Sequence, residues 1–430
     1  MATAKKQNFT IPIIVMIFLF GMISFVTNLA SPMGDVLKNQ FGIANWMGTL
    51  GVFANFIAYA IMGIPAGNLL QKKGYKKTAL IAVAAGFIGV GIQTVSGAFG
   101  SFGIYLLGAF IAGFSMCLLN TVVNPMLNKL GGGGNKGNQL IQTGGSFNSL
   151  CGTAVIILTG LLIPDITKAQ ISDVFPLMFA ALGIFAFAFC VILLTNIPEN
   201  AKAAETAEKK SESKVGPMSF RHFVLGAIAI FLYVGIEVGI PNVLQKWLQN
   251  PDLSIAGYVS NTAVAASVAA TYWLLMLVGR LVGAAIGSKV SSKAMLATVA
   301  SIGIILVACA ILVPSNLVKM PVFNGAGGFG LVSVPLNALL LVLVGLCTSV
   351  MWGGIFNLAV EGLGKYTEKA SGIFMALVCG GGILPLLQNA IVDTTGDYLV
   401  SYWLIVAALA YLLFYALAGS KNVNKDIVTE

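Results

Sequence analysis

Long apolar runs recur along almost the whole chain, and short polar segments separate them. Most runs have about 20 residues, the length at which an α-helix crosses the ~30 Å hydrocarbon core of a bilayer. A backbone surrounded by lipid must satisfy its own N–H and C=O groups, so these runs are expected to be helical. The pattern predicts an all-α membrane protein whose twelve transmembrane helices span residues 11–33, 46–70, 78–98, 101–126, 138–163, 174–196, 219–246, 262–288, 294–314, 332–358, 370–391 and 398–419.

One longer polar segment lies near the middle of the chain. Residues 200–217 mix Lys, Glu, Ala and Ser, and this composition predicts a solvated cytosolic linker between an N-terminal six-helix half, residues 1–199, and a C-terminal six-helix half, residues 218–430. The halves share a weak repeat, because residues 67–80 and 283–296 have Gly, Lys, Lys and Leu at the same four positions. Two pseudo-symmetric halves in parallel repeat are typical of transporters that bind their solute between the halves.

The few charges follow this predicted topology. Only 9% of the residues are charged and 57% are hydrophobic, which excludes a water-soluble protein. If the N-terminus is cytosolic, 19 of the 24 Lys and Arg residues face the cytosol, and the exceptions are Lys38, Lys168, Lys246, Lys319 and the intramembrane Arg280. By the positive-inside rule, both termini are then cytosolic. The net charge of +9 therefore reflects topology, and no nucleic-acid partner is predicted.

A loop after the second predicted span carries the pattern G-x-x-x-Q-K-K-G-x-K-K, from Gly67 to Lys77. It resembles the loop motif of the major facilitator superfamily, with Gln71 where an Asp is usual. Further short motifs resemble the branch that contains fucose permease and the glucose/galactose permeases: Thr27-Asn28-Leu29, Ile64-Pro65-Ala66-Gly67, Asn124-Pro125, Ser146-Phe147-Asn148-Ser149, Tyr233-Val234-Gly235, Gly279-Arg280 and Gly362-Leu363-Gly364. The resemblance implies import of a monosaccharide across a bacterial inner membrane.

Two charged side chains fall well inside predicted spans, where each charge costs at least ~2.5 kcal/mol on insertion scales. Glu237 lies about 16 residues into the seventh span, and it is predicted to bind substrate or a coupling cation. The alternative is a carboxylate that only packs between helices. Arg280 lies nearer the cytosolic end of the eighth span, so it is not expected to pair with Glu237. Gating or support between the halves is as good an interpretation of Arg280 as substrate contact.

Amides form the second group of polar residues within the spans. Asn and Gln carry one acceptor and two donor hydrogens, which matches sugar hydroxyls, and aromatic faces can stack on a sugar ring. The alternative interpretation is that amides hold helices together and that Trp marks membrane interfaces. The amides are Asn28, Asn120, Asn124, Gln142, Asn148, Asn242, Asn357 and Gln388, and the aromatic residues are Tyr233, Trp273 and Trp352. The predicted substrate-binding residues are Asn28, Asn120, Gln142, Asn148, Tyr233, Glu237, Trp352 and Asn357.

Two positions depart from the proton-coupled fucose permease pattern. That pattern has a carboxylate shortly after the first-span Asn and another four residues before the fourth-span Asn-Pro, where this chain has Ser31, or a neighbouring residue, and Asn120. A proton carrier needs a group whose protonation changes during the cycle. The coupling ion therefore stays open between H⁺ and Na⁺, with Na⁺ placed near Glu237, and coupling-free uniport is an alternative. Glu237, Arg280 and Ser31 are the predicted coupling or gating residues.

The sequence thus predicts a monomeric, multi-pass sugar transporter in a lipid bilayer, with no enzymatic activity, metal site or cofactor other than a coupling cation. The competing hypothesis within the same class is a proton antiporter that exports drugs or metabolites. A transporter-like receptor or structural membrane protein is the hypothesis from another class. A triplet of glycines, Gly380 to Gly382, is expected to interrupt the eleventh helix.

Overall fold

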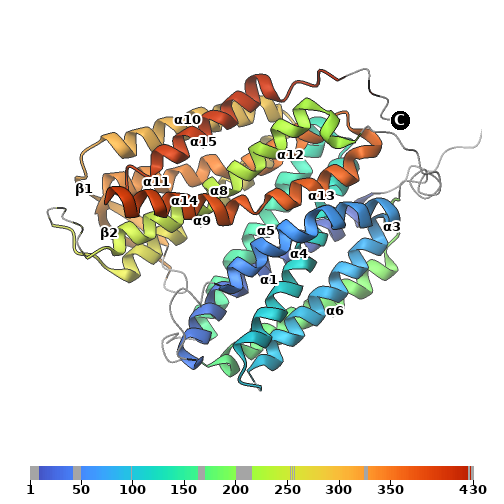
Figure 1. Cartoon of the computed structure of the whole chain (residues 1–430), viewed down its shortest axis with the longest axis horizontal. Helices are drawn as coiled ribbons and strands as arrows, with labels where there is room; N and C mark the ends of the chain where they lie inside the picture. The colour runs from blue at the N-terminus through green and yellow to red at the C-terminus, as the bar shows by residue number, and fades with distance from the viewer. Residues whose placement is uncertain are drawn as a thin grey trace, which may run out of the picture.

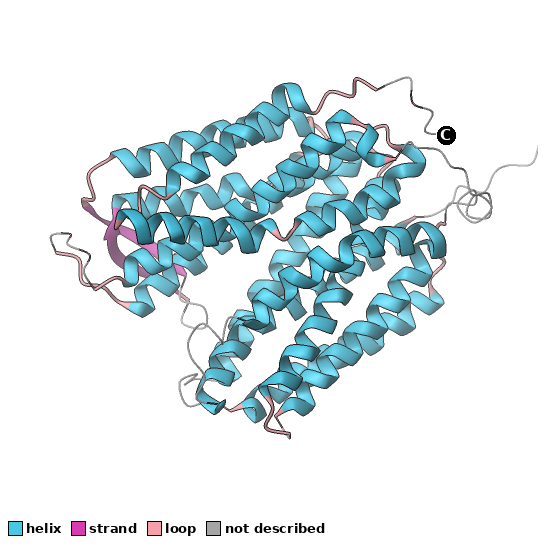
Figure 2. Cartoon of the chain, viewed as in Figure 1, coloured by secondary structure: helices cyan, strands magenta, loops and turns pink. Residues whose placement is uncertain are grey.

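The computed structural model describes residues 9–41, 50–97, 99–162, 170–199, 216–251, 253, 255, 257–323, 328–424 and 427. Within these ranges the regular secondary structure is helical apart from one β-hairpin, and short loops connect the elements (Figure 2). Ten stretches are long and apolar enough to cross a membrane. The longest of them, Phe53–Ser96, covers most of two predicted spans, 46–70 and 78–98. A further predicted span, 138–163, lies in a helix rich in Gly, Ser, Thr, Asn and Gln that is not among the ten.

The helices pack as two bundles. The first contains α1 (Thr10–Phe41), α3 (Leu50–Ser96), α4 (Phe102–Leu130), α5 (Gly134–Leu162) and α6 (Ile171–Leu194). The second contains α8 (Arg221–Gln249), α9 (Thr262–Ile286), α10 (Ser292–Leu312), α11 (Leu336–Thr348), α12 (Met351–Val360), α13 (Thr367–Leu377), α14 (Gly380–Thr395) and α15 (Tyr402–Phe414). Short helical turns occupy η1 (Pro217–Ser219), η3 (Gly364–Tyr366) and η4 (Tyr415–Gly419). Most of the predicted linker, residues 200–215, lies outside the described residues.

Some predicted spans are bent or divided in the structure. Helix α3 holds the second and third spans, joined at Gly74, whose φ of 79° lies in the left-handed region that glycine adopts without a steric penalty. Helix α13 ends at Leu377 and α14 begins at Gly380, so the eleventh span is interrupted as expected, but at residues 378–379, directly before the glycine triplet, which forms the first turn of α14. The tenth span is likewise divided, into α11 and α12.

The sequence-based prediction missed the β-hairpin. Strand β1 (Leu317–Phe323) pairs antiparallel with β2 (Phe329–Pro335), although the tenth transmembrane helix was expected to begin at residue 332. The prediction was wrong because it followed mean hydropathy, whereas side chains in these strands alternate between two faces. Val322 and Val334 are buried while Phe329 and Leu331 are exposed. The Phe323 N–H also donates to the Thr271 hydroxyl of α9, at 2.8 Å, which fixes the hairpin to the second bundle.

Among the described residues, the two bundles meet closely at one end. They converge where α3 lies against α13 and diverge toward the opposite end (Figure 1). Glycines make the close contact: a Cβ atom at Gly372 of α13 would lie 2.5 Å from both the Gly63 carbonyl oxygen and the Gly67 Cα atom of α3. Since these are backbone atoms, no side-chain rotation can relieve the overlap. We call this the closed end of the molecule, and the opposite end the open end.

Replacing Gly372 with Val is therefore expected to separate the bundles at the closed end. Overpacking costs about 1–3 kcal/mol, which shifts the ratio of closed to open conformations at this end roughly 5- to 150-fold. Spin labels at the exposed Lys73 and Lys369 would report the change as a longer inter-label distance. Gly183→Val is the matched control, because a Cβ atom there meets nothing within 4 Å. An unchanged distance in Gly372→Val would show that this contact does not hold the end closed.

Candidate functional site

A cavity of about 840 Å³ lies between the two bundles, and residues of both bundles line it. Helices α1, α3, α4 and α5 contribute one wall, and α8, α9 and α12 contribute the other. The volume is within the range of roughly 300–1,000 Å³ that is typical of small-molecule sites. The cavity lies between the two helical bundles, and secondary transporters bind their solute at the interface between such halves.

The two walls differ in chemistry. On α5, Gln142, Ser149 and Thr153 line the cavity, and their spacing places them on one helix face. Helix α1 adds Ser24, Thr27 and Asn28, so the wall from the first bundle is rich in hydroxyls and amides. The opposite wall is largely apolar, because α9 presents a stripe of residues at helical spacing: Ala266, Ala269, Ala270, Trp273 and Met276.

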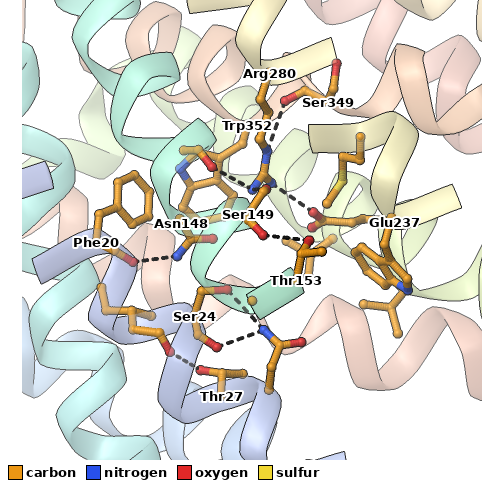
Figure 3. Close-up of a pocket in the computed structure, with 18 of the residues that line it drawn as sticks. Phe20, Ser24, Thr27, Asn148, Ser149, Thr153, Glu237, Arg280, Ser349 and Trp352 are labelled. Atoms are coloured by element: carbon orange, nitrogen blue, oxygen red, sulfur yellow. Dashed lines mark hydrogen bonds and ion pairs between the residues drawn. The ribbon is translucent and has the colours of Figure 1, made fainter. Parts of the chain in front are cut away.

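Glu237 of α8 and Arg280 of α9 form an ion pair in the cavity wall (Figure 3). Arg280 Nη2 lies 3.2 Å from Glu237 Oε1, and the side chains are only 11% and 14% exposed. The expectation that these residues do not pair was wrong. It counted the rise of each helix from its own end, which ignores the offset between neighbouring helices and the several ångströms that an Arg side chain spans.

Arg280 also joins the two bundles. Its Nη1 atom donates to the Ser149 hydroxyl at 2.6 Å and to the Gly145 carbonyl oxygen at 3.3 Å, both on α5 (Figure 3). Its Nε atom donates to the Ser349 carbonyl oxygen at 3.4 Å. A guanidinium group offers five N–H donors in one plane, which allows these simultaneous contacts. The charge of Arg280 is therefore shared between a carboxylate in its own bundle and acceptors in the other.

Four of the predicted amides line the cavity, and each donates through its amide nitrogen to a nearby protein group. The partner of Asn148 is the Phe20 carbonyl oxygen at 2.7 Å, and that of Asn28 is the Ser24 carbonyl oxygen at 2.8 Å. Asn120 donates to the Tyr59 hydroxyl at 2.6 Å, and Gln142 donates to the Val350 carbonyl oxygen at 2.8 Å. These bonds fix the orientation of the amides toward the cavity before any solute arrives.

Trp352 forms part of the end of the cavity that lies toward the closed end. Its indole Nε1–H donates to Asn124 Oδ1 of the first bundle at 3.0 Å. Tyr233 is fully buried behind Trp352, with ring centroids 6.2 Å apart, and it does not line the cavity. Asn357 does not line it either, because it is engaged with Asn128 and Ser292 further toward the closed end. The structure thus separates Tyr233 and Asn357 from the other predicted binding residues.

The predicted cation site near Glu237 has no cluster of metal-binding side chains among the described residues. Among the described residues, no group of three or more His, Cys, Asp and Glu side chains could hold a metal ion. Beside Glu237, the Arg280 guanidinium occupies the position that a cation would take. The side chain of Ser31 lies outside the described part of the structure, although its backbone is helical. Binding of Na⁺ near Glu237 and a coupling role for Ser31 stay predictions.

Ser149 and Gly145 were not predicted as partners of Arg280. The pattern that could have identified them is the i, i+3, i+4 periodicity of Gln142, Gly145, Ser149 and Thr153, which places all four on the cavity face of α5. A Cβ atom at Gly145 would lie 3.7 Å from Arg280 Cδ, an ordinary van der Waals distance, so the arginine packs directly against this face of α5. This face was not predicted because the partners of Arg280 on it are a hydroxyl and a backbone carbonyl, whereas the prediction considered charged, amide and aromatic side chains.

Comparisons with known proteins place the site in context. The sequence model of the Major Facilitator Superfamily matches residues 13–385. The chain is 29% identical over 428 residues to a glucose/galactose transporter of Brucella abortus biovar 1 (strain 9-941), covering 98% of this chain and 97% of that protein. It is 23% identical over 450 residues to the L-fucose-proton symporter of Escherichia coli (strain K12), covering 97% and 94%.

Solved structures share the fold. A crystal structure of the major facilitator transporter FucP in the outward conformation superposes with a TM-score of 0.79 at 19% sequence identity, and it covers 97% of this chain and all of that chain. The proton:xylose symporter XylE, bound to 6-bromo-6-deoxy-D-glucose, superposes with a TM-score of 0.67 at 14% identity and covers 96% of both chains. At these identities the similarity describes the arrangement of helices.

Proposed function

Because this chain belongs to the major facilitator superfamily, we propose that it imports a monosaccharide across the membrane by alternating access. The observation that carries the proposal is the cavity between the bundles, which has a polar wall opposite an apolar wall and lies against a closed end. A carrier of this kind binds solute from one side, closes over it and opens to the other side.

The chemistry of the two walls supports a sugar as the solute. Each hydroxyl of a pyranose both donates and accepts hydrogen bonds, and amides such as Asn28 and Asn148 offer both functions. The C–H face of the ring is apolar and packs well against an aromatic surface such as Trp273 or Trp352. The names of the relatives, which include glucose, galactose and fucose transporters, point to hexoses and deoxyhexoses, and amino sugars have the same hydroxyl pattern.

The proposal also specifies the membrane and the side from which the sugar enters the cavity. The loop after the first transmembrane segment of α3, with Lys72, Lys73, Lys76 and Lys77, lies at the closed end. Under the positive-inside rule this end faces the cytosol, in a bacterial inner membrane, and the cavity then opens outward. The protein acts as a monomer, since one chain supplies both walls of the site.

Transport is proposed to be coupled to a cation through Glu237. It is the only carboxylate among the described residues that line the cavity. Asn120, also in the cavity wall, is neutral, so it cannot carry a proton. Release of Glu237 from Arg280 would expose a carboxylate to a proton or another cation during the cycle.

The test is reconstitution of the purified protein in liposomes, followed by counterflow with labelled hexoses, deoxyhexoses and amino sugars. We expect exchange of at least one sugar, competition by its close stereoisomers and no exchange of amphipathic drugs. Transport of another solute without exchange of any sugar would contradict the proposal. Comparing uptake with imposed H⁺ and Na⁺ gradients then identifies the coupling ion, and equal uptake with and without gradients would identify a uniporter.

A further inference from the structure

Amides continue beyond the cavity toward the closed end. The cavity ends at Asn120 of α4, Gln142 of α5 and Trp352 of α12. Further along the same helices lie four more amides, Asn124 and Asn128 on α4, Asn138 on α5 and Asn357 on α12. Asn138 lies one turn from Gln142 on the same face of α5. Polar side chains therefore line the boundary between the bundles well past the point where the cavity closes.

These amides bond across the boundary. Asn128 Nδ2 donates to Asn357 Oδ1 at 2.6 Å, and Asn357 Nδ2 donates to the Ser292 hydroxyl at 2.9 Å. The Trp352–Asn124 bond described above adds a second link between the bundles. An apolar contact would close this end without placing amides away from water. The Asn128–Asn357 and Trp352–Asn124 bonds join the two bundles, so both must break when the closed end opens, which leaves donors and acceptors on both bundles. The Asn357–Ser292 bond lies within the second bundle and can persist.

Asn138 is the clearest sign that this region has a second use. Its side chain is 0% exposed, and neither Nδ2 nor Oδ1 has a hydrogen-bond partner among the described residues. A buried polar group without a partner is unfavourable, because its lost hydrogen bonds to water are not replaced. Gly353 of α12 lies directly against it, since a Cβ atom there would be 3.1 Å from Asn138 Oδ1 and 2.7 Å from Gln142 Nε2. The amide is thus enclosed by backbone of the opposite bundle.

We propose that Asn138, Asn128, Asn357 and Ser292 form an inner sugar-binding site, which is sealed in this conformation and accessible once the closed end opens. The inference rests on the proposed function, because its ligand is the transported sugar. Separation of the bundles breaks the Asn128–Asn357 bond and exposes Asn138. Three amides and a hydroxyl then face the opening, and they can donate to and accept from adjacent sugar hydroxyls.

The inner site continues the cavity along one face of α5. Gln142 belongs to the cavity and lies one turn from Asn138, so a sugar leaving the cavity toward the closed end can exchange partners along one face of α5. With partners in this order, the sugar hydroxyls always have protein groups to bond when they lose their hydrogen bonds to water. Loss of hydrogen bonds to polar groups in a confined site is strongly unfavourable.

The test measures half-saturating sugar concentrations separately at the two faces, in oriented proteoliposomes, with the labelled panel sugar that wild-type protein exchanges fastest. In Asn138→Leu we expect the half-saturating sugar concentration at the closed-end face to rise about tenfold relative to wild-type protein. The half-saturating concentration at the open-end face should stay within twofold of the wild-type concentration. Asn138→Ser, which replaces the amide with a hydroxyl that can still donate and accept, should recover part of the loss. The matched control is Gln388→Leu, because Gln388 is also fully buried with an unpartnered Oε1 but lies within the second bundle.

The other outcomes are distinct. If Asn138 only sets the stability of the closed conformation, Asn138→Leu will move the half-saturating sugar concentrations at the two faces in opposite directions, and the proposal is overturned. Equal changes at both faces, or no change at either, also overturn it, and so does a one-sided change in Gln388→Leu. If wild-type protein exchanges no sugar at all, the proposed function has failed, which is separate from failure of the inner site.

Discussion

Replacing Glu237 with Gln is expected to abolish gradient-driven sugar accumulation while sugar exchange continues. The amide keeps the shape of the side chain and can still accept a hydrogen bond from Arg280, which lies 3.2 Å away. It cannot change its charge, so the proposed coupling step is lost. In proteoliposomes with an imposed cation gradient, the inside-to-outside concentration ratio should fall from well above one to about one. Counterflow should fall by no more than about tenfold.

Asp393→Asn provides the matched control, because Asp393 is an exposed carboxylate near the end of α14 and does not line the cavity. Accumulation in this variant should equal that of wild-type protein. If Glu237→Gln accumulates sugar as well as wild type does, Glu237 is not the coupling group. If Asp393→Asn also loses accumulation, the effect follows from any loss of negative charge.

Replacing Arg280 with Met is expected to eliminate transport and to destabilise the protein. The change leaves Glu237 as an unpaired charge in the cavity wall, and breaking one partner of a buried ion pair costs on the order of 3 kcal/mol. It also removes the bonds to Gly145 and Ser149 that join the bundles. Counterflow should fall at least a hundredfold, and the melting temperature of the purified protein should fall measurably.

Two further variants separate the effects of Arg280. Arg280→Lys keeps the charge but lacks the planar fork of donors, so stability should be largely recovered and transport should not. In the double variant Glu237→Gln with Arg280→Met, no uncompensated charge remains, and the melting temperature should exceed that of Arg280→Met alone. A fully active Arg280→Lys variant would show that only the charge is needed. A double variant less stable than Arg280→Met would contradict the ion-pair account.

The helical framework could be predicted from sequence because lipid imposes two simple requirements, length and apolarity. The divided eleventh span was predictable too, because the glycines from Gly380 to Gly382 weaken a helix locally. The hairpin at residues 317–335 was not, because most of it falls in the loop between the ninth and tenth predicted spans, and only the alternation of its buried and exposed side chains marks it as strand. The strand period is visible in the sequence only if it is sought specifically.

The candidate site was predictable by residue type but only partly by position. Asn28, Asn120, Gln142 and Asn148 line the cavity, as their placement within apolar spans indicated. The Glu237–Arg280 pair and the distance of Asn357 from the cavity depend on the axial offset and rotation of neighbouring helices. These quantities come from packing between the bundles, and no pattern along a single helix contains them.

The size of the cavity also bears on how this protein selects its solute. A space of about 840 Å³ is generous for a single sugar ring, so entry alone cannot reject larger molecules. Selection by size must then occur when the open end closes, since only a compact solute lets the apolar wall of α9 approach the polar wall of α5. A glycoside with a bulky apolar substituent would hold the walls apart, and the protein would bind it as an inhibitor instead of carrying it.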